Sequence, residues 1–277
     1  MFKRVLFSLD LEGVNNVVGD PYSGLVKDCE QWDVARRQAV LEINAGAQAL
    51  FDAGVETVAL WDGHGGGFNI IAEDLDPRII LLDSKWTREV ARLSYAKDNY
   101  DCICYFGYHT MEGTLGGVLA HTMSSVTVQH YKLNGKYIGE VDMDAYITAE
   151  YDIPSCFFVG GDLTCKQAER AIEGIVTVVT KKEISRNEAI YRDNAELLAE
   201  IKEKIVQAVN GEYTVKKLTF PAVMEKSMKR VEDAAKYIAS RRAKGINCEY
   251  LDDEILGKDA HTVVSIVNNI DEFVKCI

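Results

Sequence analysis

Carboxylate and imidazole side chains occur where three apolar stretches of the sequence end. They are Asp10, Glu12, Asp62, His64 and His109. The stretches are predicted β-strands, and alternate residues of a strand point the same way, which pairs Asp10 with Glu12 and Asp62 with His64. Ligands of open parallel sheets bind outside the carboxyl ends of the strands, where the loops converge. Mixed carboxylates and imidazoles suit zinc, manganese or cobalt, so the pattern predicts a site for one or two metal ions.

Each of these residues also has a structural interpretation. An acid at a strand end can cap a loop, and a single histidine can be a hydrogen-bonded structural residue. The metal hypothesis therefore depends on the joint pattern. Glu140, where a predicted hairpin gives way to a helix, offers another carboxylate that spacing alone does not single out. His130 and His261 lack such placement, and we interpret both as structural or exposed.

The elements that would position this site alternate between strand and helix. A helix at 32–52 carries one apolar face and is followed by Gly54, which can end it. A second helix is expected at 88–99. Parallel strands are expected at 2–9, 57–62, 78–83 and 101–109.

After residue 121 the pattern changes. Asn134 and Gly135 separate two β-prone runs, the strongest short signal of a hairpin. Helices at 141–152 and 166–174 and strands at 156–162 and 175–183 continue the alternation. Beyond residue 185 we expect mainly helices. One would be capped by Asn194, and the other two would carry Met228, Val231 and Ile238, and Val263, Ile266, Ile270 and Val274.

These elements predict an α/β fold with an open, mostly parallel sheet and flanking helices in a Rossmann-like, three-layer arrangement. A smaller C-terminal α+β domain would follow. We place the catalytic domain at 1–185 and the smaller domain at 186–277.

Composition excludes several classes of partner. The chain has 43 acidic and 31 basic residues, a formal charge of −12, and no basic stripe to bind a nucleic-acid backbone. It has no apolar run of the length of a membrane span and no signal-peptide core, so we expect a cytoplasmic protein. Seven scattered cysteines without a C-x-x-C pattern predict buried thiols, Cys102 and Cys104 within a packed strand, and neither disulfides nor a zinc knuckle.

Other catalytic motifs are incomplete. The glycine-rich turn "HGGG" at 64–67 resembles an esterase oxyanion loop, but the chain has no G-x-S-x-G nucleophile elbow. It also lacks a phosphate-binding P-loop and a G-x-G-x-x-G after a strand. These glycines are better explained by a tight turn that lets substrate approach the backbone.

Several short motifs, taken in order, resemble the bacterial zinc D-aminopeptidases encoded with dipeptide-transport genes. The matches cover about the first two-thirds of the chain, whereas the C-terminal third shows little motif identity. The motifs are SLDLEG (8–13), DGH (62–64) with Asn69 five residues after its histidine, GYH (107–109), GGVLAHTM (116–123), IGE followed by DAY (138–146), YDIP (151–154), VGGD (159–162) and ISR (184–186).

The resemblance implies a binuclear aminopeptidase that removes the N-terminal residue of short peptides containing D-amino acids. Its two zinc ions, for which manganese or cobalt could substitute, would be held by Asp10, Glu12, His64, His109 and Glu140. Asp10 would bridge the ions, Glu12 and His109 completing one site and His64 and Glu140 the other. His121 would be the catalytic residue. The family also forms decamers of two stacked five-membered rings, so the resemblance implies a homo-oligomer.

Two other functions remain open. The same ligands would suit a two-metal hydrolase of another amide or of a phosphate ester. A non-catalytic peptide-binding protein of a transporter is the alternative from a different class, although such a protein normally carries an export signal.

Overall fold

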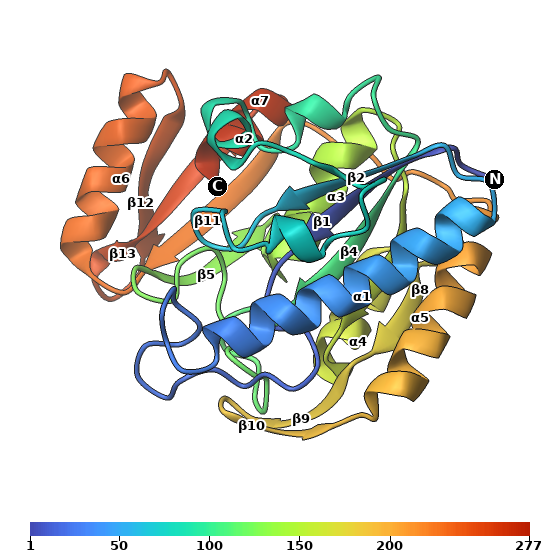
Figure 1. The fold of residues 1–277 in the computed structure, drawn as a ribbon. Coiled ribbons are helices and arrows are strands. Elements are labelled where there is room, and N and C mark those ends of the chain that lie inside the picture. Colours follow the sequence, from blue (N-terminus) through green and yellow to red (C-terminus); the bar gives the residue numbers. More distant parts are fainter.

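A six-stranded parallel sheet forms the centre of the computed structural model, which describes residues 1–277 (Figure 1). Its order is β3-β2-β1-β4-β7-β8, so the order of the strands reverses between β1 and β4. The predicted open α/β sheet is confirmed. Its strands are β1 (Arg4–Leu9), β2 (Thr57–Asp62), β3 (Ile80–Leu81), β4 (Cys102–Tyr108), β7 (Ser155–Gly160) and β8 (Val176–Val179).

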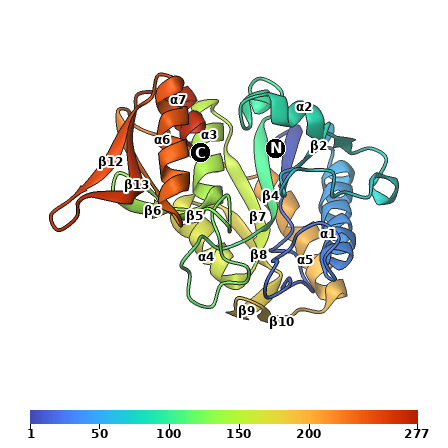
Figure 2. The ribbon, with the colours of Figure 1, turned by 90° about the vertical axis from the view of Figure 1, so that its left-hand side faces the viewer.

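Helices cover both faces of this sheet, which is why its strands are almost continuously apolar. Figure 2 shows α1 (Trp32–Asp52) and α5 (Asn194–Val209) on one side of it. On the other side lie α3 (Glu140–Glu150) and α4 (Asp162–Ala171). Every residue of β4 is buried between these layers.

The long helix α1 has the bounds that the sequence predicts. Its buried side chains include Ala39, Ile43, Ala47 and Leu50, spaced to form one face against the sheet. Gly54 follows with a φ of +90°, a conformation that ends a helix at little cost for glycine.

A second, antiparallel sheet has the order β12-β13-β11-β5-β6 and is joined by α6 (Val231–Ala243) and α7 (Ile270–Cys276). The predicted hairpin is confirmed, with Asn134 at φ 49° and Gly135 at φ 77°. The strands are β5 (Val128–Leu133), β6 (Lys136–Ile138), β11 (Ala222–Met228), β12 (Asn247–Asp253) and β13 (Gly257–Val267). β9 (Lys181–Ser185) and β10 (Glu188–Tyr191) form a separate two-stranded sheet.

Several predicted helices were wrong in detail. The segment 88–99 contains only the end of α2 (Ser84–Glu89) and the 3-10 turn η2 (Ser94–Ala96). Val90 is extended and Leu93 is left-handed at φ 57°, so the helix cannot continue. Another 3-10 turn, η1, spans Ala72–Asp74.

The C-terminal third contains more strand than expected. Met228 lies in β11, and Val263 and Ile266 lie in β13 rather than in helices. A short apolar run rich in β-branched residues fits both the helical and the strand period, so the sequence pattern alone does not distinguish them. Hydrogen bonding of β13 to β11 and β12 makes this segment a strand. The cap of α5 is Asp193, which accepts a hydrogen bond from the backbone N–H of Glu196, and not Asn194 as expected.

The domain boundary expected at residue 185 stays a prediction. β5 and β6, which precede it, belong to the same sheet as β11 to β13. α5, which follows it, contributes to the apolar core around α1. None of the helices combines the length and the apolar character needed to cross a membrane.

Candidate functional site

Five candidate metal ligands converge at the carboxyl edge of the six-stranded sheet. Asp10 and Glu12 lie in the loop after β1, His64 follows β2 and His109 follows β4. Glu140 is the first residue of α3 and reaches the same place from the second sheet. Because β1 lies between β2 and β4, the three loops meet where the strand order reverses, the usual ligand position of such a sheet.

The side chains are in direct contact. His64 Nδ1 lies 2.9 Å from Asp10 Oδ1 and 3.1 Å from Glu12 Oε2. His109 Nε2 lies 3.3 Å from Asp10 Oδ2 and 3.2 Å from Glu140 Oε1. Ligand atoms of Asp10, Glu12 and His109 all lie within 4.8 Å of one another. Asp10 thus contacts both imidazoles, one through each carboxylate oxygen.

Close packing of the loop after β1 against the end of β4 sets the position of Asp10. The Gly13 N–H donates to the Gly107 carbonyl at 2.6 Å. A Cβ on Gly13 would lie 2.0 Å from the Tyr108 carbonyl oxygen, and one on Gly107 would lie 2.1 Å from the Asp10 carbonyl oxygen. Gly107 also has a φ of +70°. Only glycine fits at both positions, which brings the loop after β1 directly onto the strand that carries His109.

Asp62, expected beside His64, turns away from the site. Its carboxylate accepts hydrogen bonds from the Asn69 backbone N–H at 2.6 Å and from Asn69 Nδ2 at 2.9 Å. Asn69 Nδ2 also lies 2.9 Å from the His64 carbonyl oxygen, and Trp32 Nε1 donates to Asn69 Oδ1 at 3.1 Å. Asp62 therefore fixes the glycine-rich turn after His64.

Both histidines have the orientation of metal ligands. His64 Nε2 lies 2.8 Å from the Leu25 carbonyl oxygen, and His109 Nδ1 lies 3.0 Å from the Thr110 carbonyl oxygen. A carbonyl only accepts, so each of these nitrogens donates and the other nitrogen faces the carboxylates. A metal-ligating histidine typically donates its second N–H in this way. The donor set fits zinc, which takes imidazole nitrogen and carboxylate oxygen.

The electrostatics of the cluster also favour a cation. Burial opposes the charged form of Asp10, but hydrogen bonds and charges from His109 and His64 hold the pKa of Asp10 well below its usual range. Burial likewise opposes ionisation of Glu140, yet His109 lowers the pKa of Glu140 to about 2. Burial disfavours charge on the two imidazoles, and Glu12 and Glu140 outweigh it, raising the pKa of His64 and of His109. A divalent cation would displace these protons.

His121 lies against the cluster. Its ring stacks on that of His109 with centroids 3.7 Å apart and planes inclined by 12°. His121 Nδ1 donates to the Leu119 carbonyl at 2.8 Å, which leaves Nε2 free. Leu119 at φ 50° and Met123 at φ 64° bracket this histidine in left-handed conformations, which are uncommon for such residues and cluster at functional sites. Nitrogens of His109 and His121 also lie within 4.8 Å of Glu140, so position alone permits His121 as a ligand.

A cavity of about 580 Å³ opens above these residues. Asp10, Glu12, His64, His121 and Glu140 line it, whereas the buried His109 lies beneath His121. A larger cavity, of about 1030 Å³, lies between α3, the β5–β6 hairpin and the segment 213–218, and none of the candidate ligands lines it.

His130 and His261 lie on the second sheet, away from the cluster. His130 on β5 packs edge-on against Tyr137 with ring centroids 5.1 Å apart. His261 lies on β13, and its Nδ1 donates to the Met228 carbonyl at 3.0 Å. Neither contacts a candidate ligand.

The sequence analysis did not identify Lys181, which is hydrogen-bonded to the loop that carries Asp10 and Glu12. Its fully buried ammonium donates to the carbonyls of Glu12 at 2.6 Å, Val14 at 2.9 Å and Val17 at 2.5 Å. Burial lowers the pKa of Lys181 to about 8. The only signal in the sequence is a lysine two residues after the end of β8, at the same edge of the sheet.

A buried ion pair beside the pocket was also missed. Arg92 Nε and Nη2 donate to the two oxygens of Asp144 at 2.5 and 2.9 Å. The Tyr108 hydroxyl donates to Asp144 at 2.7 Å and contacts the Ser8 hydroxyl at 2.6 Å. Arg92 lies in the segment expected to be helical, so its direction could not be read from the sequence.

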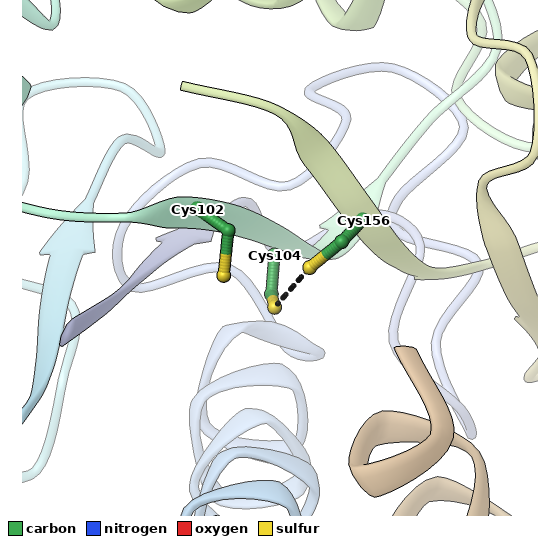
Figure 3. A group of neighbouring side chains, drawn as sticks. All are labelled: Cys102, Cys104 and Cys156. Atoms are coloured by element: carbon green, nitrogen blue, oxygen red, sulfur yellow. Dashed lines mark hydrogen bonds between the residues drawn. The ribbon is translucent and has the colours of Figure 1, made fainter. Parts of the chain in front are cut away.

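Three thiols form a second cluster of potential ligands, away from the pocket. Cys102 and Cys104 of β4 and Cys156 of β7 point to the same face of the sheet (Figure 3). Cys104 Sγ and Cys156 Sγ are 3.5 Å apart, and all three residues are wholly buried in the core that α1 and α5 cover. Burial raises the pKa of Cys102 and of Cys104, which keeps them as thiols. Burial also opposes the charged form of Cys156, but hydrogen bonds from these two thiols outweigh it and lower the pKa of Cys156 to about 5. All seven cysteines are free, as predicted, and this cluster packs as core.

Comparisons with known proteins agree with the fold and identify the family. The model of the Peptidase_M55 family, described as D-aminopeptidase, matches residues 3–270. The chain is 27% identical to the D-aminopeptidase of Bacillus subtilis (strain 168) over 218 residues, 79% of this chain and 78% of that protein. Its fold is similar to the solved structure of the Zn-dependent D-aminopeptidase DppA from Bacillus subtilis, a self-compartmentalizing protease. The TM-score is 0.85 at 22% identity, covering 99% of this chain and 94% of that chain.

Proposed function

Because the chain belongs to the Peptidase_M55 family of D-aminopeptidases, we propose that it is a binuclear metal-dependent aminopeptidase acting on short peptides. The observation that carries this proposal is the convergence of Asp10, Glu12, His64, His109 and Glu140 at one edge of the sheet. A cluster of three carboxylates is unfavourable in a buried place unless cations neutralise it.

Two zinc ions per subunit are proposed, with manganese or cobalt as substitutes. Asp10 would be shared, because its two oxygens face different histidines. Glu12 and His109 would complete one site. Their ligand atoms and those of Asp10 lie within 4.8 Å of one another, which supports this assignment. His64 and Glu140 would complete the other. The Zn-dependence of the structural relative supports the choice of metal.

When bound, the ions supply Lewis acidity for the scissile carbonyl and lower the pKa of the attacking water. The chain itself supplies the proton transfers. We assign His121 as general acid or base, because its Nε2 has no partner within the protein and lines the cavity with Glu140. The carbonyl of Leu119 holds the imidazole in the tautomer with the proton on Nδ1.

The substrate is proposed to be a short peptide, with preference for an N-terminal D-residue. A cavity of about 580 Å³ is within the usual size of small-ligand sites and has room for a short peptide. The preference for D-residues comes from the family description.

We also propose a homo-oligomer, a decamer of two five-membered rings. The structural relative is described as self-compartmentalizing, which requires several subunits around a chamber. Large apolar side chains that are almost fully exposed in the single chain would suit subunit contacts: Tyr22 at 99%, Leu115 at 97% and Ile255 at 93%. Mass measurement in solution tests this assembly.

Metal analysis combined with peptidase assays tests the proposed function. We expect bound zinc and chelator-sensitive release of the N-terminal residue from D-alanyl peptides, faster than from the L-alanyl peptides. A preparation without metal and without metal-dependent peptidase activity would contradict the proposal. Turnover of phosphate esters or other amides, but not of peptides, would instead establish the alternative two-metal hydrolase.

A further inference from the structure

The cavity above the candidate ligands has a rim of positive charge. Its acidic lining residues are confined to the three proposed ligands Asp10, Glu12 and Glu140, whereas four basic side chains surround them. The chain as a whole has more acidic than basic residues, 43 against 31, whereas the lining of this cavity has more basic than acidic residues. The basic residues are Lys27, Arg88, Arg92 and Arg186.

Arg92 differs from the other three because it is held rigidly. Two of its nitrogens are hydrogen-bonded to Asp144, and its guanidinium carbon lies 4.8 Å from the centroid of the Trp61 ring. The side chain is only 19% exposed, whereas Lys27, Arg88 and Arg186 are exposed residues. Asp144 in turn is fixed by the Tyr108 hydroxyl. A guanidinium anchored in this way loses little side-chain entropy when it binds a ligand.

One nitrogen of this guanidinium remains available. Nη1 of Arg92 makes no hydrogen bond within the protein, while Nε and Nη2 do, and Arg92 lines the cavity. Burial opposes the charge on Arg92, but Asp144 outweighs it and raises the pKa of the guanidinium, which stays charged. The cavity is therefore lined by a permanently charged guanidinium. Asp144 fixes its orientation, and the N–H groups of Nη1 remain available to a ligand.

This cation lies close to the proposed reaction centre. Asp144, its anchor, is one helical turn after Glu140 on α3, so both carboxylates leave the helix on the same face. In a dipeptide, the C-terminal carboxylate follows the scissile bond by a single residue, and one residue spans about 3.8 Å. Arg92 and Glu140 line the same cavity, so a carboxylate one residue beyond the scissile bond is expected on the side of Arg92.

Resting on the proposed function, we propose that Arg92 is a specificity-determining residue that binds the C-terminal carboxylate of a short peptide. Lys27, Arg88 and Arg186 attract the anion, and Arg92 binds it. The enzyme then selects peptides with a free carboxylate over the same peptides with a C-terminal amide, since charge-assisted bonds to arginine are stronger than neutral ones.

Paired substrates test this inference on the wild-type holoenzyme. Alanyl-alanine, in D and L forms, is compared with its C-terminal amide. We expect kcat/KM to be at least about tenfold lower for the amide, mainly through KM, which corresponds to about 1.4 kcal/mol. Equal turnover of acid and amide would overturn the inference and leave the proposed function intact. Cleavage of neither peptide would overturn both.

Variants then assign the effect to Arg92. Arg92→Gln should bring the acid-to-amide ratio close to one. Removing Arg92 leaves Asp144 buried without its partner, so Arg92→Lys is the second variant: it keeps a charge for Asp144 but loses the donor fork. Arg37→Ala, which removes an exposed arginine of α1 outside the cavity, should keep the full ratio. Retention of the full ratio in both Arg92 variants would exclude Arg92.

Binding without turnover provides a separate readout. In the metal-loaded His121→Ala variant, calorimetric titration with the acid and with the amide should show the same difference of about tenfold in Kd. Adding Arg92→Lys should reduce that difference, because the donor fork is lost while the charge remains. A purely structural role of Arg92 would weaken binding of acid and amide alike, and that result would contradict the proposal.

Discussion

The imidazole of His121 lies flat on that of His109, with ring centroids 3.7 Å apart and planes inclined by only 12°. One imidazole is buried and faces carboxylates through Nε2, whereas the other borders the cavity and keeps its Nε2 free. The two stacked imidazoles thus have different environments. His109 lies among the proposed metal ligands, and His121 lies beside the proposed substrate site.

His121→Ala should therefore separate catalysis from metal binding. We expect two metal ions per subunit to remain, because the five proposed ligands do not include His121, and kcat to fall by about 100-fold or more through loss of the proton transfer. Metal analysis and steady-state kinetics measure the two effects. His130→Ala, on the second sheet, is the matched control and should keep both. Loss of an ion in His121→Ala would make His121 a ligand.

Lys181 should be essential to the loop that carries Glu12. Lys181→Met leaves three buried carbonyls without their donor, so the free energy of unfolding should fall by about 3 kcal/mol or more. Metal affinity should fall by about 10-fold or more, because the loop is no longer held. Chemical denaturation and competition with a chelator measure these changes. The exposed neighbour Lys182 provides the control, and a Lys181→Met protein as stable as Lys182→Met would refute the role.

Glu42 should give stability a pH dependence. Its Oε1 accepts from the Asn15 N–H and Gln38 Nε2, Oε2 has no partner, and burial raises its pKa from 4.5 to about 7. Between these two values the folded state keeps a proton that the unfolded state has released. The free energy of unfolding should thus fall as pH rises from 4.5 to 7, by about 3 kcal/mol at most.

Denaturation of the metal-free protein at pH 5 and pH 7 measures this contribution. Glu42→Gln cannot ionise, so it should be less dependent on pH than the wild type and more stable than it at pH 7. Glu203→Gln, on the exposed side of α5, should behave like the wild type. Identical pH dependence in the wild type and Glu42→Gln would show that Glu42 does not titrate in this range.

The edge of the sheet at which the candidate ligands lie could be predicted, because it follows from the order of strands and helices along the chain. Strand, helix and strand in alternation require parallel strands, and their ends bring Asp10, His64 and His109 together without further information. Glu140 could not be found in this way, since it arrives from the second sheet at the start of α3. Only the resemblance to a family identified it.

Other features depend on contacts between residues far apart in sequence. Asp62 has the same two-residue spacing as Asp10, yet Asn69 turns it away from the site. Lys181 and Arg92 act through partners more than 50 residues away, Glu12 and Asp144. Val263 and Ile266 fit a helical period, and only pairing with β11 and β12 makes them strand residues. No local pattern contains this information.

Metal content of purified subunits tests the central claim, that Asp10 is shared between two ions. Total zinc, manganese and cobalt should be two ions per subunit in the wild type. Glu12→Ala and Glu140→Ala should each keep one ion, since each removes a ligand of a single site, and Asp10→Ala should keep none. One ion or none in the wild type, or two in Asp10→Ala, would contradict the account.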